Sequence, residues 1–293
     1  MSEITLLDGG MGQELVHRAG DRPTPLWSTQ VMIDHPGMVA GVHRDFADAG
    51  ATIATANSYA IHRDRLEGTG FEDRFSDLHA LALAEARNSG AARIAASIGP
   101  LGASYQADIH PEVAVAAKLY AEVAAQWQGK CDLIICETVV SVRHAESLLA
   151  GLEGLDVPIW MAFSVTDQDG TQLRSGEPLA DAVAVAAPHV QAVLINCTTP
   201  EVIPAGLDVL AKAGLPYGAY ANGFERITEG FLGDKPTVDA LRMRWDFTPE
   251  AYAEHALKWV DAGATIVGGC CEVSPAHIAE IANRLRASGH TIV

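Results

Sequence analysis

The sequence predicts an α/β protein, a single (β/α)8 TIM barrel that spans residues 1–293. Short runs rich in Val, Ile, Ala and Leu recur along the chain, and each precedes a longer segment whose apolar residues lie three to four positions apart. Hydrophobic residues make up 48% of the chain and aromatic residues only 6%, as in strands buried on both faces beneath helices. The 293 residues suffice for a barrel of about 250 residues with its loops.

Eight segments are predicted to be strands, because each is short, apolar and followed by a helical pattern. They are residues 5–10, 52–59, 92–99, 131–138, 158–165, 192–197, 217–222 and 264–271. Strands that alternate with helices through short links predict parallel pairing and right-handed crossovers. Eight such units close into a barrel, whereas a doubly wound sheet usually has fewer.

The segments between the strands carry helix signals. Residues 112–127 repeat apolar side chains on one face, and residues 249–262 follow Thr248, a residue type that caps helix N-termini. Glycines suited to helix C-termini precede five strands, namely Gly50, Gly90, Gly129, Gly214 and Gly263. No linker indicates a second domain, and residues 223–247, the longest link, are interpreted as a lid or rim loop.

Charge and composition exclude several classes of function. The chain has 37 acidic and 20 basic residues, and its formal charge of -17 would repel nucleic acid and anionic lipid. No apolar run reaches the roughly 18 residues of a membrane span, and the start of the chain lacks a signal-like pattern. We therefore expect a cytoplasmic protein that binds small-molecule substrates, with no nucleic acid and no membrane partner; the sequence leaves a homo-oligomer open.

Polar residues gather at the carboxyl ends of the predicted strands, where barrels of this kind carry their catalytic groups. Buried parallel strands gain no stability from such endings, so these residues are candidates for a functional site. In chain order they are Asp8, Gly9, Gly10, Thr55, Asn57, Tyr59, Glu137, Asn196, Cys197, Asn222, Cys270 and Cys271.

Three of the five cysteines lie at two of these strand ends. One strand separates the sixth from the eighth, so Cys197 can meet Cys270 and Cys271 above the barrel. Three thiolates with one exchangeable position are typical of a catalytic Zn²⁺ site, because structural sites usually have four protein ligands. Such a site could hold a fourth thiolate that stays nucleophilic. The alternative is that these are small core residues, the role expected for Cys131 and Cys136.

These motifs resemble those of the homocysteine S-methyltransferase family over essentially the whole chain. They are Asp-Gly-Gly-Met-Gly at 8–12, Glu-Thr at 137–138, Asn-Cys at 196–197, Gly-Gly-Cys-Cys at 268–271 and Pro-Ala-His-Ile at 275–278. The pairing of Gly-Gly-Cys-Cys with an upstream Asn-Cys is specific, whereas Asp-Gly-Gly alone is not. The resemblance implies a zinc-dependent methyltransferase of EC class 2.1.1. It would move a methyl group from a sulfonium, quaternary ammonium or folate donor to homocysteine, giving methionine.

The resemblance also implies roles for residues around the metal. Cys197, Cys270 and Cys271 would be the metal ligands. The carboxylates of Asp8 and Glu137 would hold the ammonium group of homocysteine, with backbone N–H groups of Gly9 and Gly10 near its carboxylate. Asp8 could instead cap the following helix, and Glu137 could instead pair with a nearby base at the rim.

The donor is expected to be cationic, and Trp27 and Tyr59 match aromatic positions near it, although either could be a packing residue. Thr55 and Asn222 are weaker candidates. Glu272 departs from the Gly-Thr-Thr-Pro segment common in the family; it could contact a cationic donor or cap the last helix. S-methylmethionine is favoured over S-adenosylmethionine, betaine and dimethylsulfoniopropionate, because the chain lacks the arm of the betaine enzymes and the folate and cobalamin domains of methionine synthase.

Other barrel chemistries fit less well. A Schiff-base aldolase needs a lysine at a strand end, and the lysines fall in predicted helices or loops. A retaining glycosidase needs two opposed carboxylates, yet the seventh predicted strand ends in Asn222-Gly223. A non-catalytic zinc-binding or thiol-sensing barrel, and methyl transfer to a different thiol, stay open as alternatives.

Overall fold

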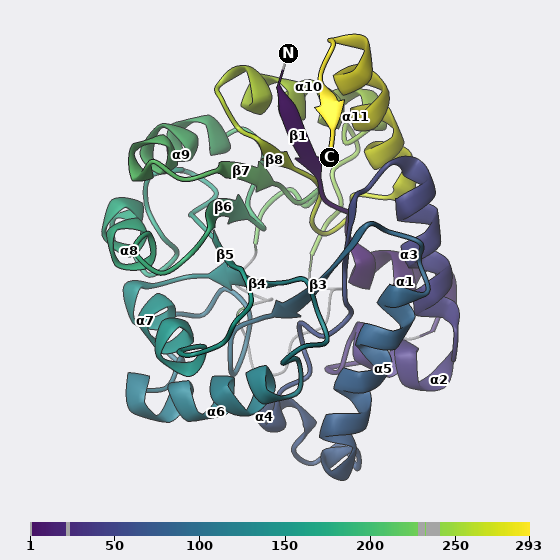
Figure 1. The fold of residues 1–293 in the computed structure, drawn as a ribbon, viewed down its shortest axis with the longest axis vertical. Helices are drawn as coiled ribbons and strands as arrows, with labels where there is room; N and C mark the ends of the chain where they lie inside the picture. The colour runs from purple at the N-terminus through teal and green to yellow at the C-terminus, as the bar shows by residue number, and fades with distance from the viewer. Residues whose placement is uncertain (1, 22–23, 228–231, 233–240) are drawn as a thin grey trace.

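The computed structural model describes residues 2–21, 24–227, 232 and 241–293, and Figure 1 shows a ring of strands surrounded by helices. Within these residues nine strands form one sheet in the order β2-β3-β4-β5-β6-β7-β8-β1-β9, with parallel pairing throughout. A parallel bridge between Leu7 and Ile53, with a hydrogen bond from Thr52 N to Leu6 O of 2.8 Å, connects β1 to β2 and closes the ring. The predicted α/β barrel is confirmed.

All eight predicted strands are present, each shorter than predicted. They are β1 (Glu3–Leu6), β2 (Ile53–Thr55), β3 (Arg93–Ile98), β4 (Leu133–Val139), β5 (Ile159–Phe163), β6 (Ala192–Asn196), β7 (Tyr217–Tyr220) and β8 (Ile266–Val267). A ninth strand, β9 (Thr291–Ile292), pairs with β1 outside the ring. It was not predicted, because two residues are too few to show an alternating pattern.

Helices follow the strands and cover the outside of the ring (Figure 1). They are α1 (Met11–Ala19), α2 (Ser28–Asp34), α3 (Met38–Ala49), α4 (Arg63–Leu66), α5 (Phe75–Arg87), α6 (Val113–Ala125), α7 (Val142–Gly151), α8 (Leu179–Ala186), α9 (Ile203–Leu210), α10 (Pro249–Asp261) and α11 (Pro275–Ala287).

The predicted helix ends are confirmed in part. Gly50 and Gly214 are C-caps and Gly263 directly follows one, whereas Gly90 and Gly129 lie two and three residues beyond the C-caps of α5 and α6. The Thr248 hydroxyl accepts a hydrogen bond from Ala251 N (3.2 Å), so Thr248 caps α10 as expected. The five glycines predicted before strands all have positive φ, a conformation that costs glycine little; Gly50, for example, ends α3 with φ 115°.

Alternation along the strands separates two cores. Leu133 and Ile135 of β4 face the interior of the barrel, while Ile134 and Cys136 pack in the larger core beneath the helices. The same alternation places Glu137 on the interior side, directly above Ile135. Cys136 is buried, and Cys131 packs partly buried against the outer core, so their predicted packing role is confirmed.

Two further expectations concern the surface of the chain. In the described residues, no helix combines the length and the apolar character that crossing a membrane requires. The segment 223–247, interpreted as a lid or rim loop, lies largely outside the described residues; only 223–227, 232 and 241–247 are described.

Candidate active site at the mouth of the barrel

A cavity of about 790 Å³ opens at the carboxyl ends of the barrel strands. Most of the predicted site residues line it, namely Asp8, Gly9, Gly10, Trp27, Thr55, Asn57, Tyr59, Glu137, Asn196, Cys197, Cys270 and Cys271. They come from segments up to 263 residues apart, from Asp8 after β1 to Cys271 after β8. The fold therefore assembles in one place the polar endings that the sequence distributes along the chain.

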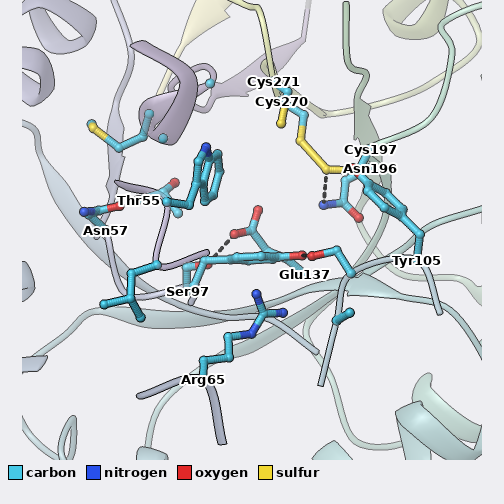
Figure 2. Close-up of a pocket in the computed structure, with 18 of the residues that line it drawn as sticks. Thr55, Asn57, Arg65, Ser97, Tyr105, Glu137, Asn196, Cys197, Cys270 and Cys271 are labelled. Carbon is cyan, nitrogen blue, oxygen red and sulfur yellow. Dashed lines mark hydrogen bonds between the residues drawn. A yellow bond between two sulfur atoms is a disulfide. The ribbon is translucent and has the colours of Figure 1, made fainter. Parts of the chain in front are cut away.

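Cysteines from two strand ends meet at one side of this cavity. Cys197, directly after β6, and Cys270, after β8, are joined as a disulfide with their Cα atoms 5.8 Å apart (Figure 2). Cys271, whose thiol is free, also lines the cavity. The side-chain amide of Asn196 donates a hydrogen bond to Cys197 Sγ at 3.5 Å.

The sulfur atoms suit a soft metal ion, although the disulfide occupies two of them in this form. Among the described residues, no group of three or more His, Cys, Asp or Glu side chains is arranged to hold a metal. Reduction of the disulfide would supply the thiol groups of Cys197 and Cys270 next to that of Cys271, and three such sulfurs are a common donor set for Zn²⁺. The residues present therefore fit a zinc ion in their reduced state.

The loop that carries the paired cysteines packs tightly against the loop after β1. A Cβ atom on Gly10 would lie 2.5 Å from the carbonyl oxygen of Cys270, and one on Gly9 would lie 2.2 Å from that of Val273. Gly10 N also donates a hydrogen bond to Val273 O at 2.8 Å. Gly10 thus uses its N–H to hold the cysteine loop, which makes it a packing residue of the site.

An arginine whose side chain is 10% exposed supports the backbone of Cys197, and no sequence pattern predicted it. Arg174 Nη2 donates to the Cys197 carbonyl oxygen at 3.0 Å and pairs with Asp167 at 2.9 Å. Its guanidinium lies 4.8 Å from the centre of the Tyr105 ring, which lines the cavity. Arg174 lies in the irregular segment after β5, where no strand ending or motif marks it.

Asp8 is buried at the floor of the cavity and is held by Thr55. Thr55 donates two hydrogen bonds to the carboxylate, from its backbone N at 2.6 Å and from its hydroxyl at 2.7 Å. Burial raises the pKa of the Asp8 carboxyl to about 7, against the two hydrogen bonds from Thr55, which lower it. The N-cap of α1 is Gly10 and has no side-chain hydrogen bond, so Asp8 does not cap that helix.

Glu137 is the second acidic group of the cavity. Its carboxylate accepts a hydrogen bond from the Ser97 hydroxyl (Figure 2) and a second one, at 2.8 Å, from the Tyr220 hydroxyl. Burial raises the pKa of Glu137, and its negative charge in turn raises the pKa of Asp8. Neither carboxylate forms an ion pair with a base in the part of the chain that the structure describes. Two such carboxylates favour a ligand with a positive charge.

Two aromatic side chains form another wall of the cavity. The rings of Trp27 and Tyr59 meet edge to face, with centroids 6.2 Å apart. Trp27 Nε1 donates to Gln13 Oε1 at 2.9 Å, and Gln13 Nε2 donates to Glu272 Oε1 at 2.6 Å. Glu272 therefore connects the cysteine loop to the aromatic wall through Gln13, and it does not cap the last helix, whose N-cap is Ser274.

Backbone strain concentrates at this mouth. The non-glycine residues with positive φ in the described part of the chain are Trp27, Tyr105, Thr138, Cys197 and Glu272. Each either lines the cavity or directly follows a residue that does. Such conformations cost roughly 1 to 3 kcal/mol each and persist where the surrounding contacts impose them, commonly at functional sites.

The two asparagines that follow the second and seventh strands have other roles. Asn57 Oδ1 accepts from Ser28 Oγ at 2.6 Å and so attaches the start of α2 to the loop after β2. Asn222 is buried and does not line the cavity; its Oδ1 accepts from Phe224 N at 3.3 Å. Position at a strand end alone does not show whether a side chain turns inward.

Four partners of the predicted site residues were missed: Gln13, Ser97, Arg174 and Tyr220. Ser97 and Tyr220 lie in predicted strands on the interior side, so counting alternate residues from the apolar interior positions could have found them. Gln13 lies on a helix and Arg174 in a loop, where that signal is absent.

Comparisons with known proteins show the family to which this fold and sequence are similar. A family model described as homocysteine S-methyltransferase matches residues 5–285. The homocysteine S-methyltransferase of Escherichia coli (strain K12) is 32% identical over 308 residues, with 96% of this chain and 95% of that protein covered. The homocysteine methyltransferase MmuM from Escherichia coli in its metallated form superposes with a TM-score of 0.81 at 27% identity, covering 97% of this chain and 96% of that one. Its oxidized form superposes with a TM-score of 0.81 at 28% identity, covering 96% of each chain.

Proposed function

The chain belongs to the homocysteine S-methyltransferase family, and on that basis we propose that it transfers a methyl group from a sulfonium or quaternary ammonium donor to the thiol of homocysteine. The product is methionine. The observation that carries the proposal is the meeting of Cys197, Cys270 and Cys271 at a cavity that also contains two carboxylates without basic partners among the described residues and an aromatic wall.

Reduced Cys197, Cys270 and Cys271 are the proposed ligands of a zinc ion. When bound, Zn²⁺ would keep the homocysteine sulfur deprotonated at neutral pH. A free thiol, with a pKa near 8.5, is mostly protonated at that pH. Asn196 and Arg174 position this side of the cavity, since they hydrogen-bond to Cys197 Sγ and to its carbonyl oxygen. We propose the cytoplasm as the location, because its reducing conditions keep such thiols free.

Asp8 and Glu137 are the proposed binding groups for the ammonium of homocysteine. Asp8 is buried and Glu137 is partly buried, and neither has a basic partner in the described structure, so an incoming ammonium would supply the missing counter-charge. The hydrogen bonds from Thr55, Ser97 and Tyr220 orient the two carboxylates before the substrate binds.

Trp27 and Tyr59 are the proposed binding surface for the cationic donor, with S-methylmethionine favoured. Their rings attract a sulfonium group without reacting with it. In the reaction the homocysteine sulfur forms a bond to the donor's methyl carbon, and the bond from that carbon to the donor sulfur breaks. The electron pair of the broken bond stays on the donor sulfur, so the donor departs as a neutral thioether. The proton of the homocysteine thiol has already gone to solvent. The protein contributes alignment of the two substrates and exclusion of water.

The test is to incubate reduced, zinc-loaded protein with homocysteine and one methyl-labelled donor at a time. The donors are S-methylmethionine, S-adenosylmethionine, betaine and dimethylsulfoniopropionate, and mass spectrometry follows labelled methionine. We expect labelled product with S-methylmethionine. Zinc binding without product from any donor would contradict the proposal and favour the non-catalytic or different-thiol alternatives.

A matched pair of cysteine variants tests the metal assignment. Cys270→Ala should lose zinc and turnover while its circular dichroism spectrum stays that of the folded barrel. Cys131→Ala, which changes a cysteine packed outside the barrel, should keep both. An active Cys270→Ala protein without metal would refute the assignment.

A further inference from the structure

The cavity contains one cationic side chain that the proposed mechanism does not use. Among the described residues that line it, the charged side chains are Asp8, Asp64, Arg65, Glu67 and Glu137. Arg65 is therefore the single positive charge in an otherwise acidic lining. Figure 2 places it across the cavity from the cysteines, with its guanidinium directed toward the middle.

Arg65 lies on the short helix α4 and is held in place without a counter-ion. Its Nη2 donates to the Pro100 carbonyl oxygen at 3.0 Å, and its guanidinium lies 5.8 Å from the centre of the Tyr59 ring. In the described residues no carboxylate forms an ion pair with it, and its buried Nε has no hydrogen-bond partner. The neighbouring Asp64 instead accepts backbone N–H bonds, from Gly102 at 2.6 Å and from Arg65 itself at 2.9 Å.

Removing a guanidinium from water, even in part, costs free energy unless an anion pairs with it. The chain as a whole is acidic, with a formal charge of -17, so carboxylates were plentiful as structural partners. Nevertheless Arg65 faces a cavity that is open to substrates. This indicates that the anion comes from a ligand.

The spacing along the wall indicates which ligand carries this anion. Tyr59 is close to both other groups: its ring centroid is 6.2 Å from that of Trp27 and 5.8 Å from the Arg65 guanidinium carbon. A sulfonium separated from a carboxylate by two or three carbon atoms spans roughly 4 to 6 Å, given bonds of about 1.5 Å. Such a zwitterion can place its cation on the aromatic rings and its carboxylate at Arg65.

We propose that Arg65 binds the carboxylate of the methyl donor, so that the enzyme selects zwitterionic sulfonium compounds over sulfonium ions without a carboxylate. The inference rests on the proposed methyl transfer and specifies its donor class. Arg65 is a specificity-determining residue in this assignment, because the arginine fork matches a carboxylate and does not attract a sulfonium that lacks one.

The test compares two donors and two arginine variants in the zinc-loaded enzyme at saturating homocysteine. Arg65→Met should lower kcat/KM for S-methylmethionine by about 10- to 100-fold, the usual effect of losing a charge-assisted pair. Its kcat/KM for trimethylsulfonium, which has no carboxylate, should stay within about 2-fold of wild type, and Arg65→Lys should partly restore the S-methylmethionine value. Arg63→Met is the matched control, since Arg63 lies on the same helix, pairs with Glu122 and does not line the cavity. It should leave kcat/KM for both donors unchanged.

Equal losses for both donors, or no loss for S-methylmethionine, would overturn the assignment. So would a rise in the KM for homocysteine that is the same with both donors, because Arg65 would then bind the acceptor. Calorimetric titration of S-methylmethionine into wild type and Arg65→Met gives an independent measurement that needs no turnover. If wild type forms no methionine, the proposed function fails. Calorimetry then still tests the carboxylate site: tighter binding of S-methylmethionine by wild type than by Arg65→Met would support it, and equal binding would refute it.

Discussion

Replacement of Thr55 by valine tests whether Asp8 must be ionised to bind homocysteine. The change removes the hydroxyl that donates to Asp8 at 2.7 Å and leaves the backbone N–H bond at 2.6 Å in place. That hydroxyl lowers the pKa of Asp8, which burial has raised to about 7. Its loss should therefore raise this pKa further.

The expected size follows from the strength of a hydrogen bond to a charged group. Such a bond stabilises the ionised form by roughly 1.5 to 3 kcal/mol, so the ionised fraction of Asp8 at pH 7 should fall from about one half to roughly one tenth or less. The KM for homocysteine at pH 7 should rise roughly 7- to 80-fold. At pH 9, where a much larger fraction of the carboxyl is ionised in the variant, the ratio of the two KM values should shrink to about 3-fold or less.

The assay measures the KM for homocysteine from pH 6 to 9 in wild type and Thr55→Val, with zinc, a reductant and saturating donor. The ratio between the two proteins cancels the titration of the substrate's own groups. Thr52→Val is the matched control, because the Thr52 hydroxyl bonds to Leu6 and Val293 at the other end of the strand. A KM ratio that does not change with pH would refute the reasoning.

Three further changes have defined outcomes. Asp8→Asn should weaken homocysteine binding yet raise the free energy of unfolding at pH 8 by at least about 1 kcal/mol. A carboxyl with a raised pKa stabilises the fold at low pH and loses this contribution as the pH rises through about 7, and denaturant titrations at pH 5 and 8 check this. Gln13→Met breaks the hydrogen-bonded connection between Trp27 and Glu272. In steady-state kinetics it should raise the donor KM about 10-fold and leave the homocysteine KM within about 2-fold of wild type; a change in both constants would contradict this. Burial lowers the pKa of His43 to about 3, so below about pH 6.5 its imidazole is protonated in the unfolded chain but not in the folded one, and the fold loses stability. His43→Leu should therefore remove about 2 kcal/mol of the destabilisation between pH 7 and 5, measured by calorimetry; parallel curves of stability against pH for the two proteins would contradict this.

The barrel could be predicted because its signals are repeated and local. Each strand carries its own apolar run, and each helix end carries its own cap, such as Thr248 or Gly50. The bounds of every strand were predicted too wide, yet the number and order of the eight strands were not affected. The two-residue strand β9 has no such repetition, and only its pairing with β1 defines it.

The site could be predicted where a strand end sets the direction of a side chain. Glu137 and Cys197 follow this rule, because the alternation of the strand and the fixed carboxyl end of the barrel place them at the mouth. Asn222 does not, since the chain has already turned away into the next loop. The contacts of Arg65 and Arg174 depend on how loops fold over the mouth, which no periodic pattern in the sequence encodes.

Metal analysis of the reduced protein tests the central claim most directly. Zinc-loaded wild type should retain one zinc ion per chain, and X-ray absorption at the zinc edge should show only sulfur among the protein ligands, with one further sulfur after homocysteine is added. Reduced protein that retains no zinc, or that keeps its zinc after Cys197→Ala, would contradict the account.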